Sequence, residues 1–269
     1  MNFNMQFEFW KYHGNGNDFV IINNIDKQFP DLSVGQIAQI CDRRYGIGAD
    51  GLIFINRSND SDFEMVYHNS DGNIGSMCGN GGRCAAAFAY AQGIADDKMI
   101  FKAFDGLHKV KINSKLVSGL GFDISLQLAD VSAVDINTNY YFLDTGSPHY
   151  VEFVDHLAEF DVVKFGRKTR YSEKFHPHGT NVNFAEISED RVFVRTYERG
   201  VENETLSCGT GVTATAIATY YKTAKTKIDI HTTGGDFKVS FTHKDGKFTN
   251  LWLQGPAVKV YNGIYEIDL

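Results

Sequence analysis

Residues 66–81 read VYHNSDGNIGSMCGNG, and residues 196–211 read TYERGVENETLSCGTG. The two stretches align without a gap at an offset of 130 residues, which places C-G-x-G on C-G-x-G and Cys78 on Cys208 (208 minus 78 is 130). Each is followed by a segment rich in small residues, GRCAAAFAYAQ and VTATAIATYYK, which predicts a helix directly after each cysteine. The alignment therefore indicates that one structural unit occurs twice.

The same offset of 130 residues joins two further pairs of segments. Residues 16–20, GNDFV, fall on residues 146–150, GSPHY, and residues 48–55, GADGLIFI, fall on residues 178–185, HGTNVNFA. Three co-linear matches at one offset predict two structurally similar halves, and the spacing is that of a domain rather than of a solenoid repeat.

Composition places the chain among ordinary soluble proteins. It has 269 residues, 43% hydrophobic and 22% charged, which favours two domains or one large domain. The net charge of −7, without a basic cluster, argues against a nucleic-acid partner. No apolar run is long enough to span a membrane and no signal peptide begins the sequence, so we expect a cytoplasmic protein with reduced cysteines.

Short apolar and alternating segments predict strands along most of the chain. They include FEFWKYHG, NDFVIINN, GLIFIN, DFEMVYHN and RVFVRTYE, with a meander over MIFKAFDG, HKVKIN, SGLGFDISLQLA and YYFLDTG. The tail, KIDIHTTGGDFKVSFTHKDGKFTNLWLQ, predicts strands joined by glycine turns. LSVGQIAQICDRR predicts a helix capped by Ser33. The expected class is α+β, mostly strands.

A cysteine at the start of a helix has particular chemistry. Glycines there let backbone N–H groups approach a ligand, and those groups with the helix dipole favour an anion. The thiolate is favoured too, so we expect a cysteine pKa below the usual value of about 8.5. Two such half-sites facing each other would hold a carboxylate and place one thiol on each side of its α-carbon.

That arrangement predicts inversion of a stereocentre by two bases. One cysteine, as thiolate, removes a proton from one face, and the other, as thiol, returns one to the opposite face. The N–H groups would stabilise the charge that develops on the carboxylate, so no cofactor is expected.

The remaining cysteines predict packing rather than chemistry. Cys84 falls on Ala214 in the duplication, and Cys41 lies in the helix predicted near residue 40. The chain has no C-x-x-C pair, which argues against a structural zinc site, and no metal is expected.

The sequence resembles the cofactor-independent diaminopimelate epimerase family over essentially its full length. The resemblance is carried by HGNGNDFVII (13–22), DRRYGIGADGL (42–52), HNSDGNIGSMCGNGGRC (68–84), GSPHYV (146–151), GTNVNF (179–184) and YERGVENETLSCGTG (197–211).

The resemblance implies two pseudo-symmetric domains, each a curved, antiparallel-rich sheet wrapped around a central helix, with the active site in the cleft between them. The expected domains are residues 1–128 with 257–269, and residues 129–256. The implied reaction interconverts LL- and meso-diaminopimelate for lysine and cell-wall synthesis, without a cofactor, in a homodimer.

The resemblance also implies roles for individual residues. Cys78 and Cys208 are the acid/base pair, and His149 and Glu198 assist proton transfer. A guanidinium matches a distal carboxylate bidentately, and a carboxylate suits an ammonium group. The residues expected to bind substrate are Asn17, Asn69, Gly79, Asn80, Asn181, Glu198, Arg199, Gly209 and Thr210.

Two positions depart from the family pattern. Ser147 stands where the family often has Asn, and Gly51 stands where it often has Gln. The segment between Glu198 and Cys208 is a residue longer than in some members. These differences bear on substrate preference and leave the cysteine pair intact.

Three alternatives remain at this point. A proline or hydroxyproline racemase would use the same cysteine pair, but its substrate has no distal end for Glu198 and Arg199 to bind. An isomerase of the phenazine type shares the fold without the pair. A non-catalytic amino-acid-binding protein would not need both cysteines, and a disulfide between them is expected only as an inactivating oxidation.

Overall fold

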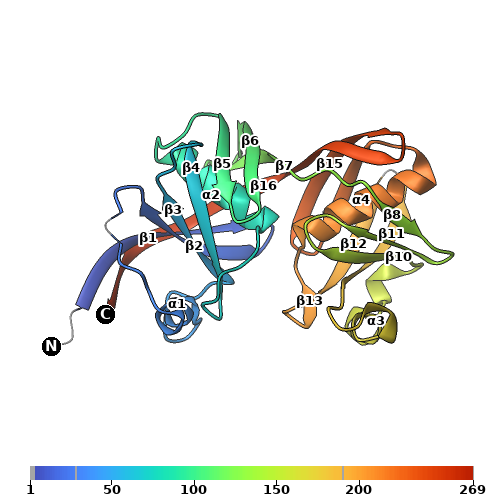
Figure 1. The fold of residues 1–269 in the computed structure, drawn as a ribbon, viewed down its shortest axis with the longest axis horizontal. Helices are drawn as coiled ribbons and strands as arrows, with labels where there is room; N and C mark the ends of the chain where they lie inside the picture. The colour runs from blue at the N-terminus through green and yellow to red at the C-terminus, as the bar shows by residue number, and fades with distance from the viewer. Residues whose placement is uncertain (1–3, 28, 190, 269) are drawn as a thin grey trace. The chain divides into compact units, whose positions relative to one another are not determined.

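The structure is a computed structural model that describes residues 4–27, 29–189 and 191–268. The chain divides into two compact units (Figure 1). Unit 1 comprises residues 1–126 with 256–269, and unit 2 comprises residues 127–255. Strands dominate both units, and the described chain has four α-helices, so the predicted α+β class is confirmed.

Unit 1 is built on a mixed sheet. β1 pairs antiparallel with β2, β2 parallel with β3, β3 antiparallel with β4, and β4 parallel with β5. β5, β6 and β7 form the predicted meander. Its elements are β1 (Asn4–Gly14), β2 (Asn17–Asn24), α1 (Val34–Cys41), β3 (Gly51–Asn56), β4 (Phe63–Asn69), α2 (Gly79–Ala91), β5 (Lys98–Ala103), β6 (Gly106–Lys115) and β7 (Gly121–Gln127).

Unit 2 repeats this pattern. β10 pairs parallel with β11, β11 antiparallel with β12, and β12 parallel with β14. Its elements are β8 (Val134–Ile136), β9 (Tyr140–Asp144), β10 (Pro148–Phe153), α3 (Val162–Arg170), β11 (Asn181–Ser188), β12 (Arg191–Glu198), β13 (Asn203–Thr205), α4 (Gly209–Thr223), β14 (Lys227–Thr232), β15 (Gly235–Lys244) and the start of β16 (Lys247–Asp268), with short 3₁₀ turns at Leu157–Glu159 and Glu173–Phe175.

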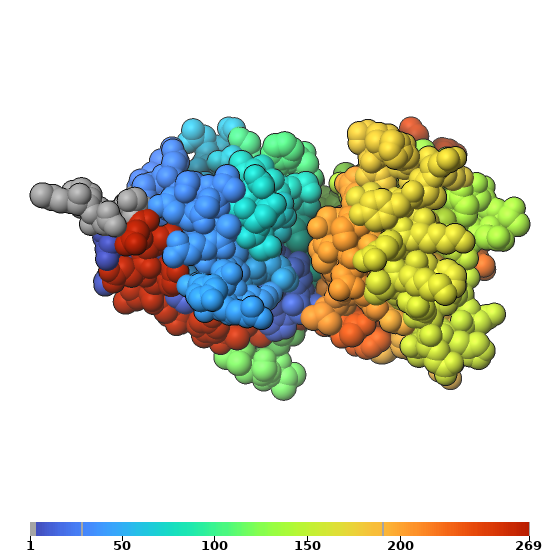
Figure 2. Space-filling model, turned by 90° about the horizontal axis from the view of Figure 1, so that it is seen from below, coloured from blue at the N-terminus to red at the C-terminus, as the bar shows by residue number. Residues whose placement is uncertain are grey.

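β16 continues beyond the segment predicted as the last strand. It pairs with β15 in unit 2, and its later part pairs with β1 in unit 1 over Val258–Asp268. The red end of β16 lies against the blue strand β1 at the surface of unit 1 (Figure 2). The C-terminal segment therefore completes the sheet of the first unit.

The duplication is exact at the level of strand register. The parallel pairs β2–β3 and β10–β11 align Phe19 with Gly51 and His149 with Asn181, and each residue of the second pair lies 130 positions after its equivalent. The parallel pairs β4–β5 and β12–β14 show the same offset. α2 and α4 also begin 130 residues apart. The sequence offset therefore describes a repeated backbone.

The central helix of each unit is buried along almost its whole length. Residues 79–89 of α2 are all buried, and α2 contacts β1, β2, β3, β4 and β6. α4 contacts β9, β10, β11, β12, β14 and β15. Figure 1 shows strands around each helix. Alanine, glycine and threonine make this possible, because small side chains let strands approach a helix from several sides.

Two local predictions have different outcomes. Ser33 caps α1 and exchanges hydrogen bonds with Gln36 in a capping box, which confirms the predicted N-cap. YYFLDTG was predicted to continue the meander of β5–β7, and this is wrong, because β9 pairs with β8 and β10 in unit 2. The helix α3 was not predicted from the sequence. Asp161 caps it, and it packs on β11 and β12 at the surface of unit 2 (Figure 2, yellow).

Gly166 on α3 provides a test of this packing. A Cβ at position 166 would lie 2.4 Å from Cβ of buried Tyr197, so Gly166→Ala forces α3 away from the sheet. We expect Gly166→Ala to lower the free energy of unfolding by about 1–3 kcal/mol, measured by urea denaturation.

The matched control is Gly35→Ala on α1. Gly35 has open space around its Cα, so alanine there should stabilise the helix by about 0.5–1 kcal/mol. Equal unfolding midpoints for the two variants would contradict the packing of α3 on Tyr197.

Candidate active site

Cys78 and Cys208 are the N-cap residues of α2 and α4. Both have extended backbone, with φ −110° and ψ 119° at Cys78 and φ −127° and ψ 111° at Cys208. Their carbonyls accept the first helical hydrogen bonds, from Gly82 N at 2.7 Å and from Val212 N at 2.8 Å. In the described chain no side chain caps either helix. The N–H groups of each first turn therefore point past the helix end, which suits an anion.

In unit 1, Cys78 lies beside Asn17 at the start of β2. Cys78 Sγ is 3.6 Å from Asn17 Oδ1, and Asn80 Nδ2 donates to the same oxygen at 3.4 Å. Asn17 Nδ2 donates to Asp50 Oδ2 at 2.7 Å. Because a carboxylate only accepts hydrogen bonds, Asp50 fixes the Asn17 amide with its oxygen toward Cys78.

A charged cluster anchors the loop that carries Asn17. Asp18 accepts from Arg43 at 2.7 Å and pairs with the buried Lys11 at 2.8 Å, and Arg43 also reaches Asp50 at 2.7 Å. Burial alone would raise the pKa of Asp18, but hydrogen bonds and charge from Arg43 and Lys11 outweigh it and hold that pKa far below its usual range. These four residues were not predicted from the sequence.

A buried arginine joins the same loop to α2. Arg83 donates to Asn15 Oδ1 at 2.7 Å and to Asn80 Oδ1 at 2.9 Å. Burial lowers the pKa of Arg83 to about 10, so the guanidinium remains charged at neutral pH. It ties the turn before Asn17 to the start of the helix.

In unit 2, Cys208 lies at the end of a chain of hydrogen-bonding groups. Its Sγ is 3.4 Å from Thr210 Oγ1, which is 2.9 Å from His149 Nε2. Ser147 Oγ is 3.0 Å from the same nitrogen. Burial, and secondarily the charge of Arg199, lowers the pKa of His149 to about 3 despite a hydrogen bond from Asn183. His149 is therefore neutral at physiological pH.

The other predicted residues are distributed over both units. Asn181 begins β11, donates to Ser147 Oγ and Pro148 O, and accepts from Arg199 N at 2.9 Å. Glu198 ends β12, and both it and Arg199 are half-buried. In unit 1, Asn69 ends β4 in an exposed turn. Gly79 and Gly209 are the first residues of α2 and α4 and are buried.

Position 51 has a steric explanation. A Cβ there would lie 2.4 Å from the ring of Tyr67 and 2.5 Å from His68 O. Gly51 therefore lets the Tyr67 ring lie directly against β3, and a longer side chain would displace it.

Cys41 and Cys84 are buried in the core, as predicted. Burial raises the pKa of Cys41 to about 12 and raises that of Cys84 further. Both therefore stay protonated. Among the described residues, no cluster of three or more His, Cys, Asp or Glu could hold a metal ion, and no helix there is long and apolar enough to cross a membrane.

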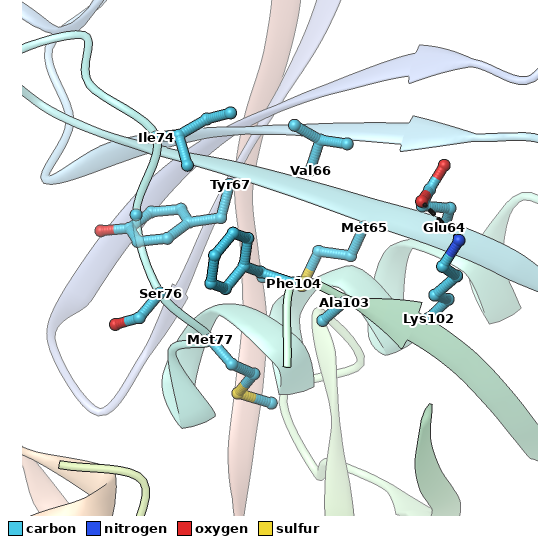
Figure 3. Close-up of a pocket in the computed structure, with 11 residues that line it drawn as sticks. Glu64, Met65, Val66, Tyr67, Ile74, Ser76, Met77, Lys102, Ala103 and Phe104 are labelled. Carbon is cyan, nitrogen blue, oxygen red and sulfur yellow. Dashed lines mark ion pairs between the residues drawn. The ribbon is translucent and has the colours of Figure 1, made fainter. Parts of the chain in front are cut away.

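A hollow of about 250 Å³ lies beside the segment that leads to Cys78 (Figure 3). Its walls are mostly apolar, with Met65, Ile74 and Phe104, and Glu64 forms an ion pair with Lys102 at 3.4 Å. The eleven residues that line it, all within the described chain, include none of the predicted site residues. The two charged groups in its lining, Glu64 and Lys102, are paired with each other.

Comparison of the sequence with known proteins identifies its family. The family model for diaminopimelate epimerase matches residues 9–117 and 141–260. The chain belongs to the diaminopimelate epimerase family. A diaminopimelate epimerase from Flavobacterium psychrophilum is 50% identical over 255 residues, covering 94% of this chain and 97% of the relative. One from Aquifex aeolicus is 38% identical, covering 95% and 96%. The family predicted from the motifs is confirmed.

Solved structures show the same fold at low identity. A phenazine biosynthesis protein of the PhzF family from Bacillus anthracis has a TM-score of 0.74 and 13% identity, covering 98% of this chain and 99% of that one. A hydroxyproline epimerase from Agrobacterium vitis has a TM-score of 0.70 and 14% identity, covering 100% and 94%. At these identities the likeness concerns the fold alone.

The Asp18 cluster predicts how the stability of the chain depends on pH. Because the pKa of Asp18 is lowered in the folded chain, its ionised form stabilises the fold above the unfolded pKa of about 4, and this stability is lost as pH falls toward the folded pKa. We expect Asp18→Asn to lower the free energy of unfolding at pH 7 by about 1–3 kcal/mol. This lies between the contribution of an exposed ion pair and the cost of breaking a buried one.

The check is chemical denaturation of both proteins between pH 7 and acid pH, where the difference should shrink as Asp18 is protonated. A difference that stays constant down to strongly acid pH would mean that the ionised carboxylate contributes nothing.

Proposed function

We propose that the chain interconverts LL- and meso-diaminopimelate by proton transfer at the α-carbon, with Cys78 and Cys208 as the two acid/base groups. The observation that carries the proposal is that both cysteines are N-cap residues of buried, uncapped helices at equivalent positions of a duplicated backbone. Relatives of this chain bear the name diaminopimelate epimerase. Inversion of a stereocentre needs two acid/base groups, one on each face of the carbon.

The helix starts account for the acidity that the reaction requires. The reacting carboxylate would lie against the N–H groups of Gly79, Asn80, Gly209 and Thr210, where two helix dipoles favour negative charge. When the α-proton leaves, charge develops on that carboxylate, and the fixed N–H groups stabilise it without reorganising. The backbone thus takes the part that an external electron sink would play, and we propose a reaction without pyridoxal phosphate.

The distal end of the substrate would be bound by polar groups around the helix starts. Arg199 suits the distal carboxylate and Glu198 the distal ammonium group, both at the end of β12. Amide groups that both donate and accept would complete this part of the site, namely those of Asn17, Asn69 and Asn181. A substrate with an amino-acid group at each end needs this second set.

The wider arrangement follows from the same proposal. We take the functional halves to be residues 1–128 with 257–269, and residues 129–256, each of which contributes one cysteine to the reaction. His149 and Glu198 support the proton transfers. We propose that the enzyme acts in the cytoplasm as a homodimer and that its product is used to make lysine and cell-wall precursors.

Exchange with solvent tests the reaction directly. In deuterated water, and without added cofactor, the chain should put deuterium at the α-carbon of LL-diaminopimelate while meso isomer forms, followed by mass spectrometry and NMR. Proline and trans-4-hydroxyproline, run in parallel, should not exchange, because they lack a distal group for Glu198 and Arg199. Exchange into proline with none into diaminopimelate would replace this proposal with a proline-type racemase.

Alanine substitution tests the two-base assignment. Cys78→Ala and Cys208→Ala should each lower the rate of inversion by at least about 10³-fold, because each removes a group that transfers a proton in the transition state. Cys84→Ala is the matched control, since Cys84 is buried in α2 with its pKa raised, and it should retain activity. Full activity in either Cys78→Ala or Cys208→Ala would refute the assignment.

A further inference from the structure

The two cysteines have different surroundings at positions that the duplication makes equivalent. Near Cys208, unit 2 has three hydrogen-bonding residues whose equivalents in unit 1, 130 positions earlier, are apolar. The pairs are His149 and Phe19, Asn183 and Ile53, and Thr196 and Val66. The three polar residues are buried, as are Phe19 and Ile53. Since burying polar groups is unfavourable unless they are hydrogen-bonded, the polar chain in unit 2 is a specific construction rather than a default of the fold.

Asn183 on β11 has a fixed amide orientation. Its Nδ2 donates to the backbone carbonyl of Tyr150 at 2.8 Å, and its Oδ1 accepts from Thr196 Oγ1 at 2.9 Å. A carbonyl can only accept, so the NH₂ group must lie on the Tyr150 side. The amide cannot be reversed without losing that bond.

That orientation determines the tautomer of His149. Asn183 Nδ2 lies 3.1 Å from His149 Nδ1, and an NH₂ group can only donate, so Nδ1 must be the unprotonated, accepting nitrogen. The ring is neutral at physiological pH, as burial and Arg199 lower its pKa. The single ring proton is therefore on Nε2.

Nε2–H then directs the hydroxyls around it. It lies 2.9 Å from Thr210 Oγ1 and 3.0 Å from Ser147 Oγ, and it donates into this pair. With its oxygen accepting from His149, the Thr210 hydroxyl has its own hydrogen to donate, and two acceptors lie 3.4 Å away, Cys208 Sγ and Ser147 Oγ. Ser147 Oγ already accepts from Asn181 Nδ2 at 3.2 Å, and a thiolate is the stronger acceptor, so we direct the Thr210 hydrogen to Cys208. The hydrogen bonds thus form a relay in which each group donates to the next, in the order Asn183, His149, Thr210 and Cys208.

We propose that Asn183 is a positioning residue that fixes His149 as the Nε2–H tautomer, so that the Thr210 hydroxyl donates to Cys208 and stabilises its thiolate. The contacts stand independently of the proposed epimerase reaction. If that reaction is correct, the relay makes Cys208 the base of the resting enzyme. A hydrogen bond donated to a charged group is stronger than one to a neutral group, so the relay favours the ionised sulfur.

At Cys78 the neighbouring group is a hydrogen-bond acceptor, whereas at Cys208 it is a donor. Asp50 turns the Asn17 amide so that its oxygen, an acceptor, faces Cys78 Sγ at 3.6 Å. An acceptor stabilises S–H and disfavours S⁻. We therefore infer that in the resting enzyme Cys78 is the protonated thiol and Cys208 is the thiolate.

The charges near each sulfur must be considered with these hydrogen bonds. Arg199, directly after β12, lowers the pKa of His149 within the relay, and Glu198 beside it has the opposite sign. On the Cys78 side Arg83 favours ionisation, whereas Asp18 and Asp50 oppose it, with Lys11 and Arg43 paired to those carboxylates. Since Arg83 donates its hydrogen bonds to Asn15 and Asn80, we assign the proton by the direct contacts. All these charges are unchanged in the variants below.

Alkylation of the full-length chain without substrate tests the relay. The rates at Cys78 and Cys208 with iodoacetamide would be followed against pH by peptide mass spectrometry. In the unmodified chain we expect Cys208 to reach half-maximal reactivity at lower pH than Cys78. Thr210→Val and Asn183→Leu should each raise the Cys208 midpoint by about one pH unit, the size of one hydrogen bond to a charged group, and leave that of Cys78 in place.

Two controls separate the relay from general effects on α4. Thr210→Ser keeps the hydroxyl and should restore the original midpoint. Thr215→Val removes another hydroxyl of α4, a fully buried one that donates to Gly211 O at 2.8 Å, and should shift neither midpoint. Identical Cys208 midpoints in Thr210→Val, Thr215→Val and the unmodified chain would overturn the relay.

The tautomer can be measured without any substitution, in case Asn183→Leu fails to fold. Long-range ¹H–¹⁵N NMR of the unmodified chain should show the His149 proton on Nε2 and a bare Nδ1 across physiological pH. A proton on Nδ1 would overturn the proposal. Since neither experiment uses substrate, a chain that exchanges deuterium but shows no midpoint shift would disprove the relay alone, and the reverse result would disprove the epimerase alone.

Discussion

The constraint on which the rest of the structure depends is that two buried helices begin at cysteines whose side chains make no capping hydrogen bond. A buried N–H without an acceptor is costly, and most helices in proteins satisfy their first turn with a capping side chain. Here α1 has such a cap at Ser33, whereas α2 and α4 begin at Cys78 and Cys208 without one. In the proposed reaction these two helix starts bind the substrate carboxylate, each beside a thiol.

Much of the surrounding sequence serves that arrangement. The small residues of α2 and α4 let strands enclose both helices, and the glycines of each C-G-x-G leave room at the helix start. At position 211 this room is essential, because a Cβ would lie 2.3 Å from Asn183 Oδ1. At the equivalent Gly81 the nearest atom is the flexible end of Ile53, at 3.3 Å. The same backbone therefore carries a polar network in one unit and an apolar core in the other.

This difference bears on how a duplicated fold supports an asymmetric reaction. Inversion by two bases needs two similar sites in opposite protonation states. The duplication supplies the similar sites, down to the register of the parallel strand pairs. The departure from symmetry, through His149 and Asn183 in place of Phe19 and Ile53, supplies the difference in protonation that we propose.

The sequence predicted those features that repeat or that depend on local patterns. The offset of 130 residues predicted the two helices, their cysteines and the strand pairs around them, and Ser33 marked a helix start. β9 was predicted to pair within the meander of β5–β7 because strand periodicity contains no information about which partner a strand pairs with. α3 was missed because the short segment VVKFGRKTR has only three apolar side chains among basic residues, and its position depends on Gly166 packing against Tyr197.

The site was predictable to a similar extent. Cys78 and Cys208 followed from the duplication, but the Asp18 cluster did not, because it joins charges from three separate segments. Asn183 was visible only as a polar residue in the apolar strand NVNF, where its equivalent is Ile53. Its importance depends on the direction of an amide, which needs the Tyr150 carbonyl and the His149 ring in place.

A crystal structure of the enzyme with an unreactive diaminopimelate analogue bound would test the central claim most directly. The claim is that Cys78 and Cys208 act on opposite faces of one α-carbon. The expected result is one Sγ on each side of that carbon, at contact distance, with the adjacent carboxylate against the N-termini of α2 and α4. Both sulfurs on one face, or a carboxylate bound away from the helix starts, would contradict it.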